Sequence, residues 1–286
     1  MNTGRSLIDL ATELQRQNEQ KQDFLAPAQD ITMSLSNALE YDPDPALYEH
    51  RKTPVISMTS KPEPFGITSP AHTQIGARLG IPARYYAKMR TEDPLLLAHN
   101  VNRWLDKRDE TRLLRTLDGD LRAFLSDRYR TVDHWDVANV ALPALTDAGC
   151  DVVSTEVTDT RLYLKASTPR LTRDIAKDDP VQAGLMITNS ETGHGALNIQ
   201  PFINRLVCLN GMVVPDSGMR KYHIGQKLDI DSFLSHDTRT HMDKALIGQV
   251  EDTVQGLLSA DGFDALVDQL RQAAGEEVRA SPDKVV

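Results

Sequence analysis

The chain has 286 residues, of which 40% are hydrophobic and 26% charged, enough to bury one large core or two smaller ones. Its net charge of -9 argues against binding polyanions through charge alone, and no apolar run approaches the roughly 18 to 20 residues of a membrane-spanning helix. Because residues 1–30 also lack the apolar segment of a secretory signal, we expect a soluble, cytoplasmic protein with no membrane partner.

The first 64 residues are expected to form an arm followed by irregular chain. In residues 1–24, leucines spaced three and four apart predict a mostly polar helix. Residues 26–64 contain six prolines, and only 55–58 has the composition of a strand. This segment therefore predicts irregular chain with one or two short strands.

Helical and hairpin patterns alternate in the next part of the chain. Two short helices are expected on either side of Gly80, which favours a packed helical corner over a helix-turn-helix. A longer helix is expected over 94–108, and two alternating bursts around an Asp-Gly-Asp turn predict a hairpin over 110–125. Residues 132–148 predict an amphipathic helix interrupted by Pro143.

The second half predicts two more hairpins and a helical end. Strands are expected at 152–157 and 161–166, followed by a polar loop at 170–179, a hairpin within 184–211 and acidic helices over 229–274. Hairpin-length connections join antiparallel strands, so the order predicts an α+β fold with a central antiparallel sheet flanked by helices. The expected parts are an arm with its irregular segment, an α+β core, C-terminal helices and a tail, at 1–64, 65–228, 229–274 and 275–286.

Charge is distributed unevenly along the chain. Residues 84–130 and 198–227 each carry +3, whereas 1–83, 131–197 and 228–286 carry -3, -5 and -7. If the two basic stretches meet in the fold, they form one positive surface on an acidic protein, as in proteins that bind a phosphate backbone. Pairing of these cations with scattered Asp and Glu would instead favour a protein-interaction surface.

The candidate nucleic-acid-binding residues come from these basic stretches. Arginines on the two strands of the first hairpin would stand in a row, although a solvated sheet face has the same pattern. Arg128 and Arg130 could contact phosphates while Tyr129 stacks on a base; alternatively, Tyr129 packs inward and both arginines pair with carboxylates. Arg205 is either a partner of Glu191 or a groove residue. The full set is Arg112, Arg115, Arg122, Arg128, Tyr129, Arg130, Arg205, Arg220 and Lys221.

Catalytic arrangements are weak in this sequence. Cys208 with His194 or His223 could supply a nucleophile and a base, but a thiol in an apolar run favours burial. His236 and His241 are five residues apart, which does not place them on one helical face. Without a phosphate-binding loop, dinucleotide motif or paired cysteines, we expect no cofactor and no catalysis, with a metal-dependent nuclease as the remaining enzyme alternative.

Four motifs resemble a known family. They lie at 122–130, 187–193, 205–211 and 220–223. In this order they are similar to the prokaryotic, phage- and plasmid-associated family called domain of unknown function nine hundred thirty-two, over about residues 65 to 250. Leu209 stands where the family commonly has threonine, and Lys221-Tyr222-His223 is a looser version of the family's basic-histidine step.

The resemblance implies a protein of a mobile element in a bacterial host, with no settled activity. Its helix-hairpin-helix order is more remotely similar to the single-strand annealing proteins of phage recombination, such as RecT, Erf and lambda Red beta. We therefore expect a homo-oligomeric protein that binds single-stranded DNA or RNA without cutting it and acts in annealing or recombination. The alternative is a non-enzymatic interaction protein that inhibits or redirects a host defence or replication factor through its acidic C-terminal helices.

Overall fold

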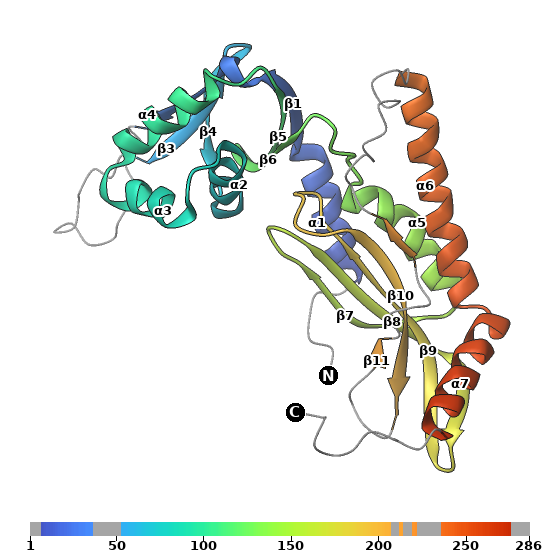
Figure 1. Cartoon of the computed structure of the whole chain (residues 1–286). Helices are drawn as coiled ribbons and strands as arrows, with labels where there is room; N and C mark the ends of the chain where they lie inside the picture. Colours follow the sequence, from blue (N-terminus) through green and yellow to red (C-terminus); the bar gives the residue numbers. More distant parts are fainter. Residues whose placement is uncertain (1–6, 37–52, 207–211, 214–218, 222–235, 276–286) are drawn as a thin grey trace, which may run out of the picture.

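Two six-stranded sheets, each covered by its own helices, divide the molecule into two lobes (Figure 1). The structure is a computed structural model that describes residues 7–36, 53–206, 212–213, 219–221 and 236–275. The chain crosses between the lobes twice, once near Lys21 and again between Ser126 and His134. Among the described residues, no helix has both the length and the apolar character needed to cross a bilayer.

The first lobe is built on a sheet with the strand order β1-β5-β6-β4-β3-β2. All its pairings are antiparallel except that of β4 with β6, which is parallel. The β5–β6 hairpin turns at Asp118 and Gly119, both with positive φ, as its Asp-Gly pair predicts. The strands are β1 Gln22–Pro27, β2 Ile31–Leu35, β3 Pro54–Met58, β4 Lys61–Ile67, β5 Thr111–Leu117 and β6 Asp120–Ser126, with a 3-10 turn at Ala28–Asp30.

Three helices cover one face of this sheet: α2 Ser69–Leu79, α3 Ala83–Glu92 and α4 Pro94–Leu105. Thr68 caps α2 through its side chain, and Gly80 ends it in the left-handed conformation at φ 73°. The first core lies between the helices and the sheet and contains Ile56, Ile75, Leu97, Leu114 and Phe124. The expected packed helical corner is therefore present, at the turn between α2 and α3.

The second lobe has a sheet with the order β11-β10-β9-β8-β7, and β12 pairs with β10. Its strands are β7 Asp151–Val157, β8 Leu162–Ala176, β9 Asp179–Asn189, β10 Leu197–Arg205, β11 Met212–Val213 and β12 Met219–Lys221. Its helices are α1 Leu7–Gln20, α5 His134–Asp147, α6 His236–Leu257 and α7 Ala260–Gly275. Leu14, Val137, Ile187 and Val250 belong to its main core, and Phe263 of α7 belongs to a second cluster.

The α+β class is confirmed, with mostly antiparallel strands and with helices near both ends of the described chain; the strands are divided between two sheets. Residues 22–35 and 54–67 form four strands of a first sheet rather than irregular chain, since their prolines fall at strand ends, in edge strands or beside an irregular pairing. The polar loop expected at 170–179 is also wrong: β8 and β9 extend through it. The expected domain limits stay a prediction, although the two main cores separate near residue 126 apart from α1, which belongs to the second core.

Candidate functional site

Three of the candidate arginines lie inside the protein, which corrects their expected place on a nucleic-acid surface. Arg115 on β5 is 0% exposed. Its Nε is 2.9 Å from Asp23 Oδ1, its Nη2 is 2.6 Å from Asp133 Oδ1, and its Nη1 donates to the Glu191 carbonyl oxygen at 2.9 Å. Burial lowers the pKa of Arg115, but the nearby carboxylates outweigh it and the net pKa is raised. Arg115 is therefore a permanent internal cation.

Arg122 occupies an irregular position in the same hairpin. Arg115 pairs with Ala123 and Thr116 pairs with Leu121, so Arg122 is the extra residue of a bulge. Its Nη2 lies 2.6 Å from Glu191 Oε2, and both side chains are buried. A bulge redirects a side chain, and here it aims the guanidinium at the second lobe.

Glu191 also closes the first turn of α5. Its Oε1 accepts a hydrogen bond from the backbone N–H of His134, the first residue of that helix. Asp133, which stands at the N-cap position, makes no capping bond with its side chain and instead pairs with Arg115 and Lys21. A carboxylate from a distant turn thus satisfies a helix N–H that the local cap leaves open.

We call the group Asp23, Arg115, Arg122, Asp133 and Glu191 the lobe junction. It ties together both chain crossings and the turn between β9 and β10. Burial raises the pKa of the Asp133 carboxyl, but the charges of Arg115 and Lys21 outweigh this and hold the pKa at about 2. For Glu191, burial is likewise outweighed, by His134 and Arg122, and the net pKa is lowered. These carboxylates are ionised at neutral pH and act as structural counter-charges.

The turn that follows β9 docks into the first lobe. Its polar residues from Asn189 to Thr192 are all buried. The Tyr129 hydroxyl donates to the Ser190 carbonyl oxygen at 2.9 Å, and Gln74 Nε2 donates to the Thr192 carbonyl oxygen at 2.6 Å. Tyr129 therefore takes the inward alternative, and its hydrogen-bonded ring is not available to stack on a base.

Gly193 is the position of this turn that requires glycine. Its φ is +77°, and an added Cβ would lie 2.8 Å from a methyl carbon of Leu125. Gly195, two residues on, does not have a positive φ. His194 lies between the two glycines. Its ring Nδ1 is 3.0 Å from the Thr192 hydroxyl, and its backbone N–H donates a hydrogen bond to the Ser190 hydroxyl. These contacts give His194 a structural role in the turn.

The other candidates lie in several separate parts of the protein. Arg112 is buried, pairs with Glu110 and lies 5.5 Å from the centre of the Phe124 ring. Arg205 pairs with Asp179 rather than Glu191, with Nε 3.0 Å from Oδ1. Arg128, which is exposed, and Arg130, which is half-buried, follow β6 in the connection between the lobes. Arg220, which is exposed, and Lys221 lie on strand β12 in the second lobe.

The cysteines and histidines considered for catalysis lie only partly within the described residues. Cys208 and His223 lie outside the described residues. Cys150 is half-buried, and burial, followed by the charge of Asp151, raises the pKa of its thiol to about 11. Within the described ranges, no three His, Cys, Asp or Glu side chains are grouped as metal ligands.

The sequence interpretation missed a repeated pattern, whose first copy lies on α3 and whose second copy begins in α4 and ends two residues beyond it, at Lys107. Arg84-Tyr85-Tyr86-Ala87-Lys88 and Arg103-Trp104-Leu105-Asp106-Lys107 share an arginine, an aromatic residue directly after it and a lysine four positions on. In both copies these three residues are exposed, with Tyr85 at 46% and Trp104 at 42%. The signal was readable, because positions i, i+1 and i+4 share one helical face.

We call Arg84, Tyr85, Lys88, Arg103, Trp104 and Lys107 the basic-aromatic helix pair. Lys107 Nζ lies 4.9 Å from the Trp104 ring centre, and Lys88 Nζ lies 3.6 Å from Glu92 in an exposed ion pair. Residues 69–108, which span α2 to α4, carry a net charge of +4 on a chain whose total is -9. Positive charge therefore gathers in the helical layer of the first lobe (Figure 1).

The model of a family described as Domain of unknown function (DUF932) matches residues 123–240. These residues are therefore similar to the DUF932 family. The match begins in β6 and includes the turn after β9, but it leaves α3 and α4 outside, so it is narrower than the expected span of 65–250. No curated protein and no solved structure matches the chain, and the more remote likeness to annealing proteins stays a prediction.

Proposed function

We propose that this protein binds single-stranded nucleic acid with little sequence preference, through the basic-aromatic helix pair. The observation that carries the proposal is the repeated exposed trio of arginine, aromatic residue and lysine on two neighbouring helices. In the buried arginines of the junction, every charge has an internal carboxylate; the six side chains of the helix pair instead face solvent.

The chemistry of the trio suits an unpaired strand. Lysine and arginine attract phosphates and release counterions, and an exposed ring offers a stacking surface to any base. A duplex hides its base faces, so Tyr85 and Trp104 would contribute only to single strands. Exposed charges contribute little to folding stability, which allows binding and stability to be separated by substitution.

Annealing of complementary strands and self-association are further parts of the proposal. A protein that holds the backbone and stacks only some bases leaves the others free to pair. Pairing of two labelled complementary strands, measured with and without protein, tests annealing, and the mass of the native particle tests self-association.

The direct test is the binding of labelled single- and double-stranded oligonucleotides of about 20 nucleotides across a salt series. The double variant Arg103→Gln/Lys107→Gln should bind more weakly, and the slope of log affinity against log salt should fall by roughly 0.7 for each phosphate that the variant no longer neutralises. Trp104→Ala should weaken single-strand binding by about 1 to 3 kcal/mol without changing that slope.

A matched control is Arg271→Gln, which removes an exposed helical arginine from α7 of the second lobe. Its affinity should equal that of the wild type. Binding can also be followed through Trp104 emission in a Trp135→Phe background, since these are the two tryptophans of the chain. If the wild type does not bind single strands at low salt, or if Arg271→Gln weakens binding as much as the helix-pair variant does, the proposal is wrong.

A further inference from the structure

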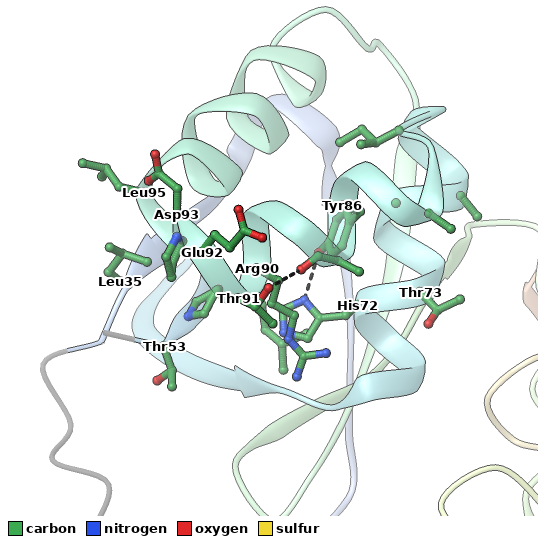
Figure 2. A pocket seen from close by; sticks show the side chains of 18 of the residues that line it. Leu35, Thr53, His72, Thr73, Tyr86, Arg90, Thr91, Glu92, Asp93 and Leu95 are labelled. Carbon is green, nitrogen blue, oxygen red and sulfur yellow. Dashed lines mark hydrogen bonds between the residues drawn. The ribbon is translucent and has the colours of Figure 1, made fainter. Parts of the chain in front are cut away.

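A cavity of about 1390 Å³ opens in the first lobe between α2, α3 and the ends of three strands (Figure 2). Apolar side chains such as Leu35 and Ile67 form part of its wall, and His72, Tyr86, Arg90 and three threonines also line it. Gly76 lets the Tyr86 ring lie directly against α2, because an added Cβ would be 2.9 Å from a ring carbon. The cavity is separate from the lobe junction.

The polar lining contains one cation, Arg90, two acidic residues, Glu92 and Asp93, and neutral hydrogen-bonding groups. His72 Nδ1 is 2.9 Å from the Tyr86 hydroxyl, and burial, followed by the charge of Arg90, lowers the pKa of His72 to about 3. His72 is therefore neutral at physiological pH. Figure 2 shows the Arg90 side chain lying beside His72, and within the described chain Arg90 makes no ion pair or hydrogen bond.

The two acidic residues of the lining do not neutralise Arg90. Glu92 lies 3.6 Å from Lys88, and the Asp93 carboxylate accepts a hydrogen bond from the backbone N–H of Leu96 as the cap of α4. Arg90 thus brings an unneutralised guanidinium into a mixed apolar and hydroxyl-bearing cavity. A guanidinium with free donors is the side chain best suited to bind a phosphate by paired hydrogen bonds.

We propose that this cavity binds one nucleoside phosphate, with its phosphate on Arg90 and its base and sugar against the apolar wall, Tyr86 and the threonine hydroxyls. An alkyl chain would find too many polar groups there, and inorganic phosphate alone would leave the apolar wall unused. The nucleoside phosphate has two sources: a free nucleotide, or one nucleotide of a bound strand. The second source fits the proposed function, because α3 carries Arg90 in the cavity lining and also the exposed Arg84 and Lys88.

The experiment measures binding of thymidine 5′-monophosphate and deoxyadenosine 5′-monophosphate to the full chain by calorimetry, with thymidine and inorganic phosphate as partial ligands. Arg90→Gln removes the cation, and Ala77→Phe fills the cavity without changing charge from an exposed position of α2. Each should weaken monophosphate binding about tenfold or more. Arg271→Gln, on α7 of the second lobe, is the matched control and should bind the monophosphate as the wild type does.

Thermal midpoints of all three variants should match the wild type, and Ala87→Leu, another cavity-lining change, replaces Ala77→Phe if that variant unfolds. Displacement of the monophosphate by an oligonucleotide identifies a strand nucleotide as the occupant, and binding of both together identifies a free nucleotide; both outcomes support the assignment. The assignment is overturned if the monophosphate binds no more tightly than thymidine or phosphate. It is also overturned if both Arg90→Gln and Ala77→Phe bind the monophosphate as the wild type does. A chain that binds monophosphate but no oligonucleotide contradicts the proposed function alone.

Discussion

Replacing Asp133 with asparagine should destabilise the protein by about 2 to 4 kcal/mol at pH 7. The folded structure lowers the pKa of Asp133 from 3.8 to about 2, and each unit is worth about 1.4 kcal/mol, which gives the lower figure. The variant also leaves Arg115 and Lys21 facing a neutral amide in a largely buried site, and removing one partner of a buried pair costs up to several kcal/mol.

The effect should depend on pH in a defined direction. A carboxyl whose folded pKa is depressed stabilises the protein fully above its unfolded pKa of 3.8 and loses that contribution as the pH falls through about 2. The stability gap between wild type and Asp133→Asn should therefore be constant from pH 7 to about 5 and should shrink below pH 4. Urea unfolding at several pH values measures this gap directly.

Asp136, one turn into α5, supplies the control. Burial, followed by the charge of Asp133, raises the pKa of Asp136, so its ionised form is disfavoured in the folded protein. Asp136→Asn should leave stability at pH 7 unchanged or higher. Equal stability of Asp133→Asn and wild type, or a gap that stays the same between pH 7 and pH 3, would refute the assignment of Asp133 as an ionised counter-charge.

The remaining predictions concern the docked turn and the thiol. Tyr129→Phe should cost about 1 kcal/mol in urea unfolding, because it removes one hydrogen bond, and should leave oligonucleotide binding unchanged. Gly193→Val should cost about 2 to 4 kcal/mol because of its positive φ and its contact with Leu125, and equal cost in Gly195→Val would contradict the turn geometry. Alkylation of Cys150, located by mass spectrometry, should be about a hundredfold slower at pH 8 than that of an exposed thiol and should rise with pH up to about 11; fast reaction at pH 8 would refute its burial.

The sequence predicted the local hairpins better than the sheets that contain them. The turns at Asp118-Gly119 and at Gly193 need positive φ angles, and the residue types at these positions indicate this without any long-range information. The membership of β1 to β4 in one sheet could not be inferred, because strands β4 and β6 pair in parallel across three intervening helices. In β8, the apolar positions Leu171 and Ile175 pack against the cluster that includes α7, yet the polar residues between them resemble a loop.

The burial of Arg115 shows why the local sequence pattern led us to predict that this arginine lies on a binding surface. In an alternating strand, an arginine is normally assigned to the solvent face. Here its three partners come from residues 23, 133 and 191, which are far apart in sequence, and only their convergence offsets the cost of burying the charge. The trios of α3 and α4 need no such convergence, since all six side chains are exposed and only Lys107 lies beyond the end of its helix.

The DUF932 match contains part of the buried lobe junction and none of the exposed helix pair. Within residues 123–240, Tyr129, Asp133 and Glu191 are used to dock the second lobe onto the first, so their polar character reflects assembly of the fold. The exposed cations and rings of α3 and α4 precede the match. Substitutions in the matched junction should therefore change unfolding first and binding only through loss of folded protein, whereas substitutions in the helix pair should change binding at constant stability. The family match therefore covers residues that hold the two lobes together, whereas the proposed binding residues lie on the surface of the first lobe.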